Sequence, residues 1–248
     1  MTGTNIKRLY ILDYGLFQVH ANGRIIGIMG YLIQTQDGRN ILVDTGFPAK
    51  YVDDVEHATK EDRLDAFGRV VSLTANNLPA AQLALIGLSP ADIDVLIMTH
   101  THIDHVGGIA DFPQAPIIIS QVERALDYPL YWGDVHPISW PEDAAYQLIE
   151  DDTEFCSGLS IFFTPGHAPG QLSLLVTLPQ TGKILLTSDA ISRPAEIDEA
   201  FDTARDPAQA IASANKLMAI AKRENALIIY GHDPAQWETL RKTPYCYE

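Results

Sequence analysis

A dense run of metal-binding side chains directly follows an apolar segment of this chain and limits the folds open to it. Asp94-Val95-Leu96-Ile97-Met98 has the pattern of a buried strand, and Thr99-His100-Thr101-His102-Ile103-Asp104-His105 comes next. Imidazole nitrogens and carboxylate oxygens suit zinc, iron, cobalt or manganese. Alternate residues of an extended segment share a face, so His100 and His102 point the same way. The turn after them lets Asp104 and His105 reach a second point nearby, which predicts a metal-binding loop at a strand end.

Three further ligand-type residues also follow apolar runs. His167 ends Thr164-Pro165-Gly166-His167, Asp189 follows Ile184–Leu186, and His232 follows Leu227–Ile229. A single histidine after a strand is more often a hydrogen-bonded turn residue than a ligand. The recurrence of the pattern is what indicates ligands that converge on one end of the sheets.

The remaining pattern favours an α+β fold. Apolar runs bounded by Gly, Pro, Asp or Asn predict strands at Leu9–Leu12, Ile25–Ile33, Ile41–Val43, Val95–Met98, Ile117–Ile119, Leu159–Phe163, Leu172–Val176, Ile184–Leu186 and Leu227–Tyr230. Helices are predicted over Pro79–Ile86 and Pro207–Arg223, the second from Asp206 as N-cap and a stripe that includes Ala210, Ile211, Leu217 and Met218. Strands dominate and come in runs, which predicts a layered sandwich rather than strict βαβ winding.

No linker or repeat divides the 248 residues, so we expect one domain over residues 1–248. Residues 47–77 lack strand character and carry clustered charge. Such an excursion is typical of a lid or binding loop, and a partly helical surface insertion fits the same pattern.

Charge and composition exclude several classes of partner. Lys and Arg number 17 against 32 Asp and Glu, a formal net charge of −15, which disfavours nucleic acid and anionic membrane surfaces. No apolar run approaches the roughly 18 residues of a membrane helix, and the N-terminus lacks the apolar core of a signal peptide. Two distant cysteines, Cys156 and Cys246, predict free thiols. We therefore expect a soluble cytoplasmic protein without a nucleic-acid or membrane partner.

Taken together, the motifs resemble the metallo-β-lactamase superfamily, and within it the N-acyl homoserine lactonase branch. The resemblance is carried by H-x-H-x-D-H at 100–105 together with Ile41-Leu42-Val43-Asp44-Thr45-Gly46, Thr164-Pro165-Gly166-His167-Ala168-Pro169-Gly170 and Tyr230-Gly231-His232-Asp233. It implies a four-layer αββα sandwich. The bridging position holds Asp189 rather than Cys, which separates the chain from the lactamases that use a thiolate there.

The resemblance also implies a ligand set for two divalent cations, with zinc expected first and iron, cobalt or manganese as alternatives. One cation would take His100, His102 and His167, the other Asp104, His105 and His232, and Asp189 would bridge them. Two such ions ~3.5–4 Å apart hold a bridging water and lower its pKa toward ~7. The resulting hydroxide would open the ester ring of a lactone, and Asp104 would pass a proton to the leaving alkoxide.

One position departs from the lactonase pattern. Three residues after the bridging aspartate, the acyl-homoserine lactonases carry a tyrosine that hydrogen-bonds the substrate, whereas this chain has Ser192. Either another residue supplies that hydrogen bond or the substrate differs. The substrate-binding role of Ser192 is thus an open prediction.

Other motifs have simpler interpretations. Asp44-Thr45-Gly46 matches the D-T-G of aspartic proteases, but these need two such carboxylates and the chain has one copy, so we interpret Asp44 as a residue that supports the metal site. His20, His57 and His136 fit no ligand pattern and are predicted to be ordinary surface or loop residues. Aromatic residues at 128, 131, 132 and 140 suit either an apolar substrate wall or plain packing.

Four functions stay open. A dinuclear lactonase acting on an acyl-homoserine lactone or a related small lactone leads. A glyoxalase II-like thioesterase or phosphodiesterase shares the ligand set, but its anionic substrates call for basic residues, and few besides Arg193 stand near the motifs. A persulfide dioxygenase-like enzyme would hold a single iron, and a structural metal domain would be richer in cysteine. A homodimer is compatible with the sequence, which does not determine the oligomeric state.

Overall fold

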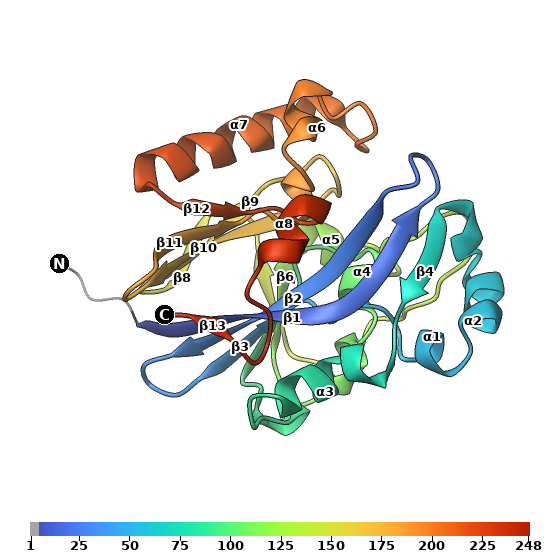
Figure 1. Cartoon of the computed structure of the whole chain (residues 1–248), viewed down its shortest axis with the longest axis horizontal. Coiled ribbons are helices and arrows are strands. Elements are labelled where there is room, and N and C mark those ends of the chain that lie inside the picture. Colours follow the sequence, from blue (N-terminus) through green and yellow to red (C-terminus); the bar gives the residue numbers. More distant parts are fainter. Residues whose placement is uncertain (1–4) are drawn as a thin grey trace.

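The computed structural model describes residues 5–248 and places two β-sheets face to face between outer helices (Figure 1). The first sheet has the order β13 (Cys246–Tyr247), β1 (Ile6–Val19), β2 (Ile25–Thr35), β3 (Asn40–Val43), β5 (Val95–Ile97), β6 (Ile117–Ser120) and β7 (Tyr146–Ile149), and β4 (Gly68–Ser72) pairs with the end of β1. The second has the order β12 (Leu227–Ile229), β11 (Gly182–Leu186), β10 (Leu172–Leu178), β9 (Leu159–Phe163) and β8 (Thr153–Cys156).

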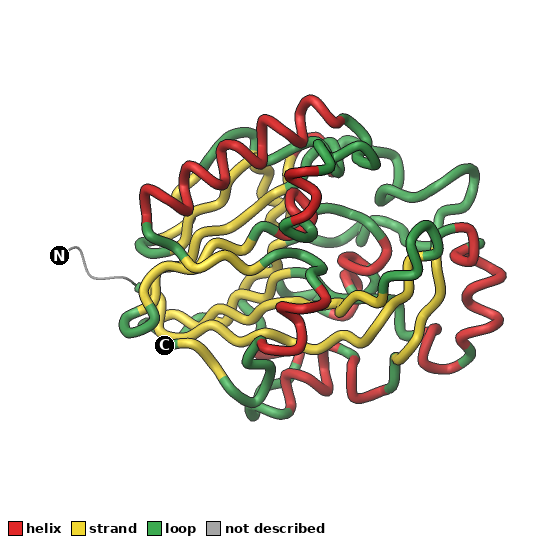
Figure 2. The backbone as a smooth tube through the Cα atoms, turned by 45° about the horizontal axis from the view of Figure 1, so that its top comes forward, coloured by secondary structure: helices red, strands yellow, loops and turns green. Residues whose placement is uncertain are grey.

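Helices cover the outer face of each sheet. The long helix α7 (Pro207–Glu224) lies over the second sheet, as the turned view of Figure 2 also shows. Helices α1 (Lys50–Asp53), α2 (Val55–Asp62) and α3 (Pro79–Ala84) lie on the side of the first sheet. The shorter helices are α4 (Ile103–Val106), α5 (Gln121–Arg124), α6 (Ala195–Asp198) and α8 (Pro234–Thr239), and 3-10 turns occupy Leu64–Ala66, Ala75–Asn77, Pro90–Asp92, Ile109–Asp111 and Ser188–Ile191.

Three apolar layers hold the four structural layers together. In β3, Ile41 and Val43 face the gap between the sheets while Leu42 faces the helices of the first sheet. In β10, Leu174 belongs to the inter-sheet core and Leu175 packs beneath α7. Successive strand residues point to opposite faces, so a strand buried on both faces has a continuous apolar run. This confirms the α+β sandwich of four layers.

All nine predicted strands and both predicted helices are present, but the apolar stripe of α7 was predicted incorrectly at two positions. The Asp206 side chain caps this helix by accepting a 3.0 Å hydrogen bond from the backbone N–H of Gln209. Ile211 and Met218 are 39% and 36% exposed, whereas Ser213 and Ile220 lie on the buried face of the helix. The buried face is thus rotated slightly from the predicted one.

The expectation that residues 47–77 lack a strand is wrong, because β4 lies within them and pairs antiparallel with β1. Its outer residues Arg69–Ser72 are largely exposed, so it has no alternating apolar signal. The rest of the segment contains α1, α2 and two 3-10 turns, as a partly helical insertion would. Within residues 5–248, no helix is both long and apolar enough to cross a bilayer.

Candidate metal centre

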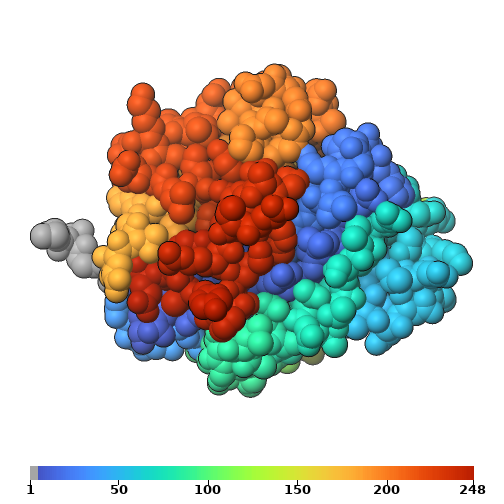
Figure 3. Space-filling view, viewed as in Figure 1, coloured from blue at the N-terminus to red at the C-terminus, as the bar shows by residue number. Residues whose placement is uncertain are grey.

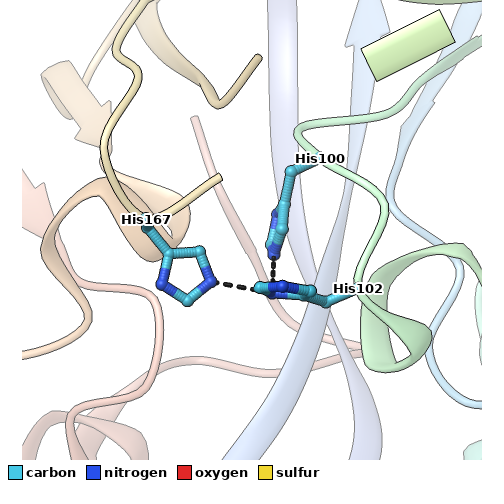
Figure 4. Close-up of side chains that lie close together, drawn as sticks. All are labelled: His100, His102 and His167. Carbon is cyan, nitrogen blue, oxygen red and sulfur yellow. Dashed lines mark hydrogen bonds between the residues drawn. The ribbon is translucent and has the colours of Figure 1, made fainter. Parts of the chain in front are cut away.

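Three histidine rings meet at the mouth between the two sheets. Strand β5 ends at Ile97, and the loop after it carries His100 and then His102, which stands at the N-terminus of α4. The Nδ1 atom of His102 lies 3.0 Å from Nε2 of His100 and 2.8 Å from Nε2 of His167, and the three rings point toward one another (Figure 4). His167 comes from the loop between β9 and β10, so both sheets contribute to this group.

A second group lies beside the first. The single turn of α4 places Asp104 and His105 next to each other, and the loop after β12 supplies His232. Oδ2 of Asp104 lies 3.6 Å from Nε2 of His232 and 3.7 Å from Nε2 of His105. The ligand atoms of these three residues all lie within 4.8 Å of one another, as do those of His100, His102 and His167.

Asp189 stands between the two groups with one carboxylate oxygen facing each. Oδ1 lies 3.2 Å from Nε2 of His232 and 3.4 Å from Nε2 of His105, while Oδ2 lies 3.3 Å from Nε2 of His167. Ser188, just before it, has φ of 46°, a left-handed conformation that costs free energy for a residue with a Cβ. The structure therefore brings all seven predicted ligands into one cage.

The unsatisfied polar atoms of the cage test whether metal ions fit it. Nε2 of His105, Nε2 of His232 and Oδ1 of Asp189 are buried, and none has a hydrogen-bond partner within the described chain. Buried polar atoms are nearly always satisfied, so these three call for an additional partner. A cation would satisfy all of them, and the nitrogen and oxygen donor set suits a divalent ion.

The opposite ring nitrogens are held by the protein, which directs the free nitrogens into the cage. Nδ1–H of His232 donates to the carbonyl oxygen of Gly27 at 2.9 Å, and Nδ1 of His105 lies 2.9 Å from Oδ2 of Asp44. Such contacts fix the ring orientation and tautomer of metal-binding histidines. Asp44 also accepts hydrogen bonds from the Thr99 backbone N–H at 2.8 Å and the Thr99 hydroxyl at 2.7 Å, so it supports the site as expected.

Burial and charge divide the histidines into two classes. Burial lowers the pKa of His100 and His102, and that of His167 to about 4, which favours the neutral, ligand-competent ring. Burial also opposes protonation of His105 and His232, but Asp104 and Asp189 outweigh it and raise both pKa values. Burial would raise the pKa of Asp189, yet the surrounding histidines hold it well below its usual value.

A buried carboxylate that the sequence analysis missed ties the ligand loops together. Glu123 accepts the hydroxyl of Thr101 at 2.5 Å and the backbone N–H of Gly170 at 2.9 Å. A Cβ at Gly170 would lie 1.8 Å from the Ser120 hydroxyl, so only glycine allows this approach. The Thr101 hydroxyl also accepts the backbone N–H of Leu130 at 2.8 Å, which anchors the loop that carries Trp132.

The cage opens into a cavity of about 650 Å³ with one apolar and one polar wall. The apolar wall includes Phe17, Phe47, Leu64, Phe67 and Trp132, so residues 47–77 supply three of its members. Phe67 stacks on Trp132 with ring centroids 3.4 Å apart, and Trp132 lies parallel to His102 at 5.9 Å. Of the four aromatic residues with two interpretations, Trp132 lines this cavity, whereas Tyr128 stacks on His136 and Trp140 donates to the Leu126 carbonyl oxygen.

The polar wall contains residues with no local sequence signal. Ser192 lines the cavity, and its backbone carbonyl accepts the N–H of His232 at 2.8 Å. Arg24 and Glu196 line the same wall. Arg24 is distant in sequence from every ligand motif, so the expectation of few basic residues near the site missed it. His20, predicted to be an ordinary loop residue, also lies at this cavity and is exposed.

Comparisons with known proteins agree with this geometry. A family model described as the Metallo-beta-lactamase superfamily matches residues 27–232. The N-acyl homoserine lactonase AiiA of Bacillus thuringiensis subsp. kurstaki is 29% identical over 268 aligned positions, which cover 96% of this chain and 98% of that protein. An N-acyl homoserine lactonase of Bacillus cereus is 31% identical over 208 positions, covering 83% of this chain and 81% of that protein.

A solved structure shares the whole fold. An N-acyl homoserine lactone hydrolase with the product N-hexanoyl-L-homoserine bound at its catalytic metal centre has a TM-score of 0.83 and 27% identity, and the match covers 98% of this chain and 100% of that one. The resemblance to the lactonase branch noted from the motifs is therefore confirmed along nearly the full length. The chain belongs to the metallo-beta-lactamase superfamily.

Proposed function

We propose that this protein is a dinuclear metal-dependent hydrolase that opens the ester ring of a lactone, either an acyl-homoserine lactone or a related small lactone. The observation that carries the proposal is the position of Asp189, whose two oxygens face two separate groups of ligand atoms. The near full-length similarity to N-acyl homoserine lactonases supports the lactone as substrate class.

The residues of the cage form two sets, one for each of two cations. His100, His102 and His167 would hold one, Asp104, His105 and His232 the other, and Asp189 would contact both. Zinc suits this donor set, as do iron, cobalt and manganese. When bound, the pair would supply a water of lowered pKa as nucleophile and polarise the ester carbonyl.

The overall reaction adds one water to the lactone. A bond forms between the water oxygen and the carbonyl carbon, the bond from that carbon to the ring oxygen breaks, and the ring oxygen leaves as an alkoxide that takes up a proton. Asp104 lines the cavity with its side chain 18% exposed, so its carboxylate can carry that proton to the alkoxide. The product is a hydroxy acid.

The apolar wall orients the substrate. Phe67 and Trp132 line the same cavity as Ser192 and Arg24, so an acyl or alkyl part can lie against the aromatic rings while the ester faces the cage. We propose that residues 47–77 act as a fixed wall of this cavity within one domain over residues 1–248, and that Ser192 contacts the substrate in place of the family tyrosine.

A glyoxalase II-like thioesterase is the second candidate, and Arg24 is the observation that favours it, because a cation in the cavity suits an anionic thioester. A preference for glutathione thioesters over lactones would select it. One iron per chain would instead favour the persulfide dioxygenase-like reading.

The test is a panel of lactones offered to protein of measured metal content. We expect about two divalent ions per chain and ring opening of at least one acyl-homoserine lactone or small lactone. Asp189→Ala should lose both metal and activity, while Asp198→Ala, which removes an exposed carboxylate of α6, should keep both. Full activity in Asp189→Ala, or no lactone opened by the metal-loaded protein, would contradict the proposal.

A further inference from the structure

Arg24 is brought into the cavity by the hairpin between β1 and β2. The turn covers residues 20–22, the Arg24 backbone N–H donates to Oδ1 of Asn22 at 3.0 Å, and the Arg24 carbonyl accepts the N–H of Val19 at 2.9 Å. The hairpin lies beside the segment around α6, and Figure 3 shows the blue N-terminal hairpin adjoining the orange segment. Arg24 thus lines one wall together with Ser192 and Glu196.

The guanidinium of Arg24 makes no direct ion pair within the described chain. No carboxylate of residues 5–248 forms an ion pair with it, and its Nε is buried without a hydrogen-bond partner. The neighbouring cation Arg193 is paired with Glu199. Burial lowers the pKa of Arg24 and the charge of Arg193 lowers it further, while the carboxylates of Glu196, Glu199 and Asp189 act in the opposite direction without offsetting the shift.

Glu196, the carboxylate that lines the same wall, is held by the backbone through one of its oxygens. Oε2 of Glu196 accepts the backbone N–H of Ser192 at 2.7 Å, and burial raises its pKa. The charges of Asp104 and Asp189 would be offset by two divalent cations in the cage. A partly desolvated cation without a direct ion pair is costly, so a carboxylate bound beside Arg24 would lower that cost.

We propose that Arg24 is a specificity-determining residue that binds a carboxylate carried by the lactone substrate. The inference rests on the proposed lactonase function and narrows it to lactones with an acidic substituent near the ring. The planar fork of arginine matches two carboxylate oxygens, and such charge-assisted bonds are stronger than neutral ones. Hydrolysis of such a lactone consumes one water and yields a hydroxy dicarboxylate.

Two lactones of the same ring size test this. 5-Oxotetrahydrofuran-2-carboxylate carries a carboxylate where γ-valerolactone carries a methyl group, and their products are 2-hydroxyglutarate and 4-hydroxypentanoate. For Arg24→Met we expect kcat/KM for the carboxylated lactone to fall about 10- to 100-fold, mainly through KM, and kcat/KM for γ-valerolactone to change less than about 2-fold. Arg24→Lys should restore part of the loss, because it keeps the charge without the fork.

Binding gives a readout that does not depend on turnover. Calorimetry should show 2-hydroxyglutarate bound about 10- to 100-fold more weakly by Arg24→Met than by the wild type, with little change for 4-hydroxypentanoate. Arg69→Met is the matched control, because Arg69 lies on the neighbouring β4 and donates to Oε1 of Gln18 at 2.7 Å outside the cavity. It should leave both ligands unaffected.

The outcomes separate this inference from the proposed function. Equal losses for both lactones in Arg24→Met, or no loss for either, would overturn the role of Arg24 while leaving the lactonase intact. A wild type that opens only the neutral lactone would do the same. Failure to open any lactone would remove the proposed function and this inference with it.

Discussion

Nδ1 of His105 lies 2.9 Å from Oδ2 of Asp44, a residue that comes from the end of β3. Asp44 has φ of 59°, a left-handed conformation that is uncommon for a residue with a side chain. Its carboxylate is also fixed by the backbone and hydroxyl of Thr99. The strained residue therefore sets the direction in which the His105 ring points into the cage.

Replacement of Asp44 by alanine should weaken metal binding without removing a ligand. Outer partners of ligating histidines typically contribute 10- to 100-fold in affinity, so we expect a loss of about that size, measured by competition with a chelator. Asp37→Ala, in an exposed turn, is the control. Unchanged affinity in Asp44→Ala would mean that His105 does not need this support.

Gly231 should tolerate no side chain. A Cβ there would lie 2.6 Å from the Ser188 carbonyl oxygen and 2.8 Å from Oδ1 of Asp189, closer than real contacts allow. We expect Gly231→Ala to lower both thermal stability and metal content, because the loop that carries His232 must move away. In Gly23→Ala the new Cβ would have open space around it, and the only cost is the strain of a positive φ. The metal content of this variant should therefore stay unchanged. Equal metal content in the two variants would refute this account.

Trp132 should matter most for long acyl chains. Apolar burial is worth about 0.8 kcal/mol per methylene, and Trp132 with Phe67 supplies much of the apolar wall. In Trp132→Ala, kcat/KM should therefore rise less steeply from short to long acyl chains than in the wild type. Tyr128→Ala, which removes a 45% exposed ring stacked on His136, should leave the slope unchanged. A steeper slope in Trp132→Ala would contradict the assignment of this wall.

Acid should destabilise the metal-stripped protein between about pH 6.5 and 4. The folded state lowers the pKa of His100, His102 and His167 below the unfolded value, so unfolding takes up protons in this range. Each such histidine costs up to about 1.4 kcal/mol of stability per pH unit. His105 and His232 have raised pKa values, so their stabilisation is fully present below pH ~6.5 and does not change there.

Urea unfolding in the presence of a chelator measures this slope. The free energy of unfolding should decline as the pH falls from 6.5 to 4, and His167→Gln should show a shallower decline. A flat profile, or one that rises toward acid, would show that these rings are not held neutral by burial.

The sequence was sufficient to predict the strands that are buried on both faces and the seven residues that the fold brings into one cage. Strands such as β3 and β10 contain continuous apolar runs, Ile41–Val43 and Leu174–Val176, because apolar layers cover both faces of each sheet. Edge strands such as β4 and β7 have exposed residues, so they lack that signal. The motif at 100–105 was informative because a single helical turn, α4, keeps its ligands adjacent.

The cavity walls could not be predicted in the same way. Arg24, Glu196 and Phe67 come from a hairpin loop, helix α6 and the turn before β4, and they reach the site only through tertiary packing. Glu123 has the pattern of an ordinary helix residue, and only its contacts with Thr101 and Gly170 reveal its role. The spacing of ligand-type residues thus predicted the cage, whereas the residues that line the cavity come from segments that only the fold brings together.

The most direct test of the central claim is the position of ¹⁸O in the ring-opened product when N-hexanoyl homoserine lactone is hydrolysed in H₂¹⁸O by metal-loaded protein. Attack on the carbonyl carbon predicts one ¹⁸O in the product carboxylate, none in its hydroxyl group, and no product from Asp189→Ala. Label in the hydroxyl group, or product formation at the same rate after removal of the metal, would contradict metal-dependent opening of the lactone at its carbonyl.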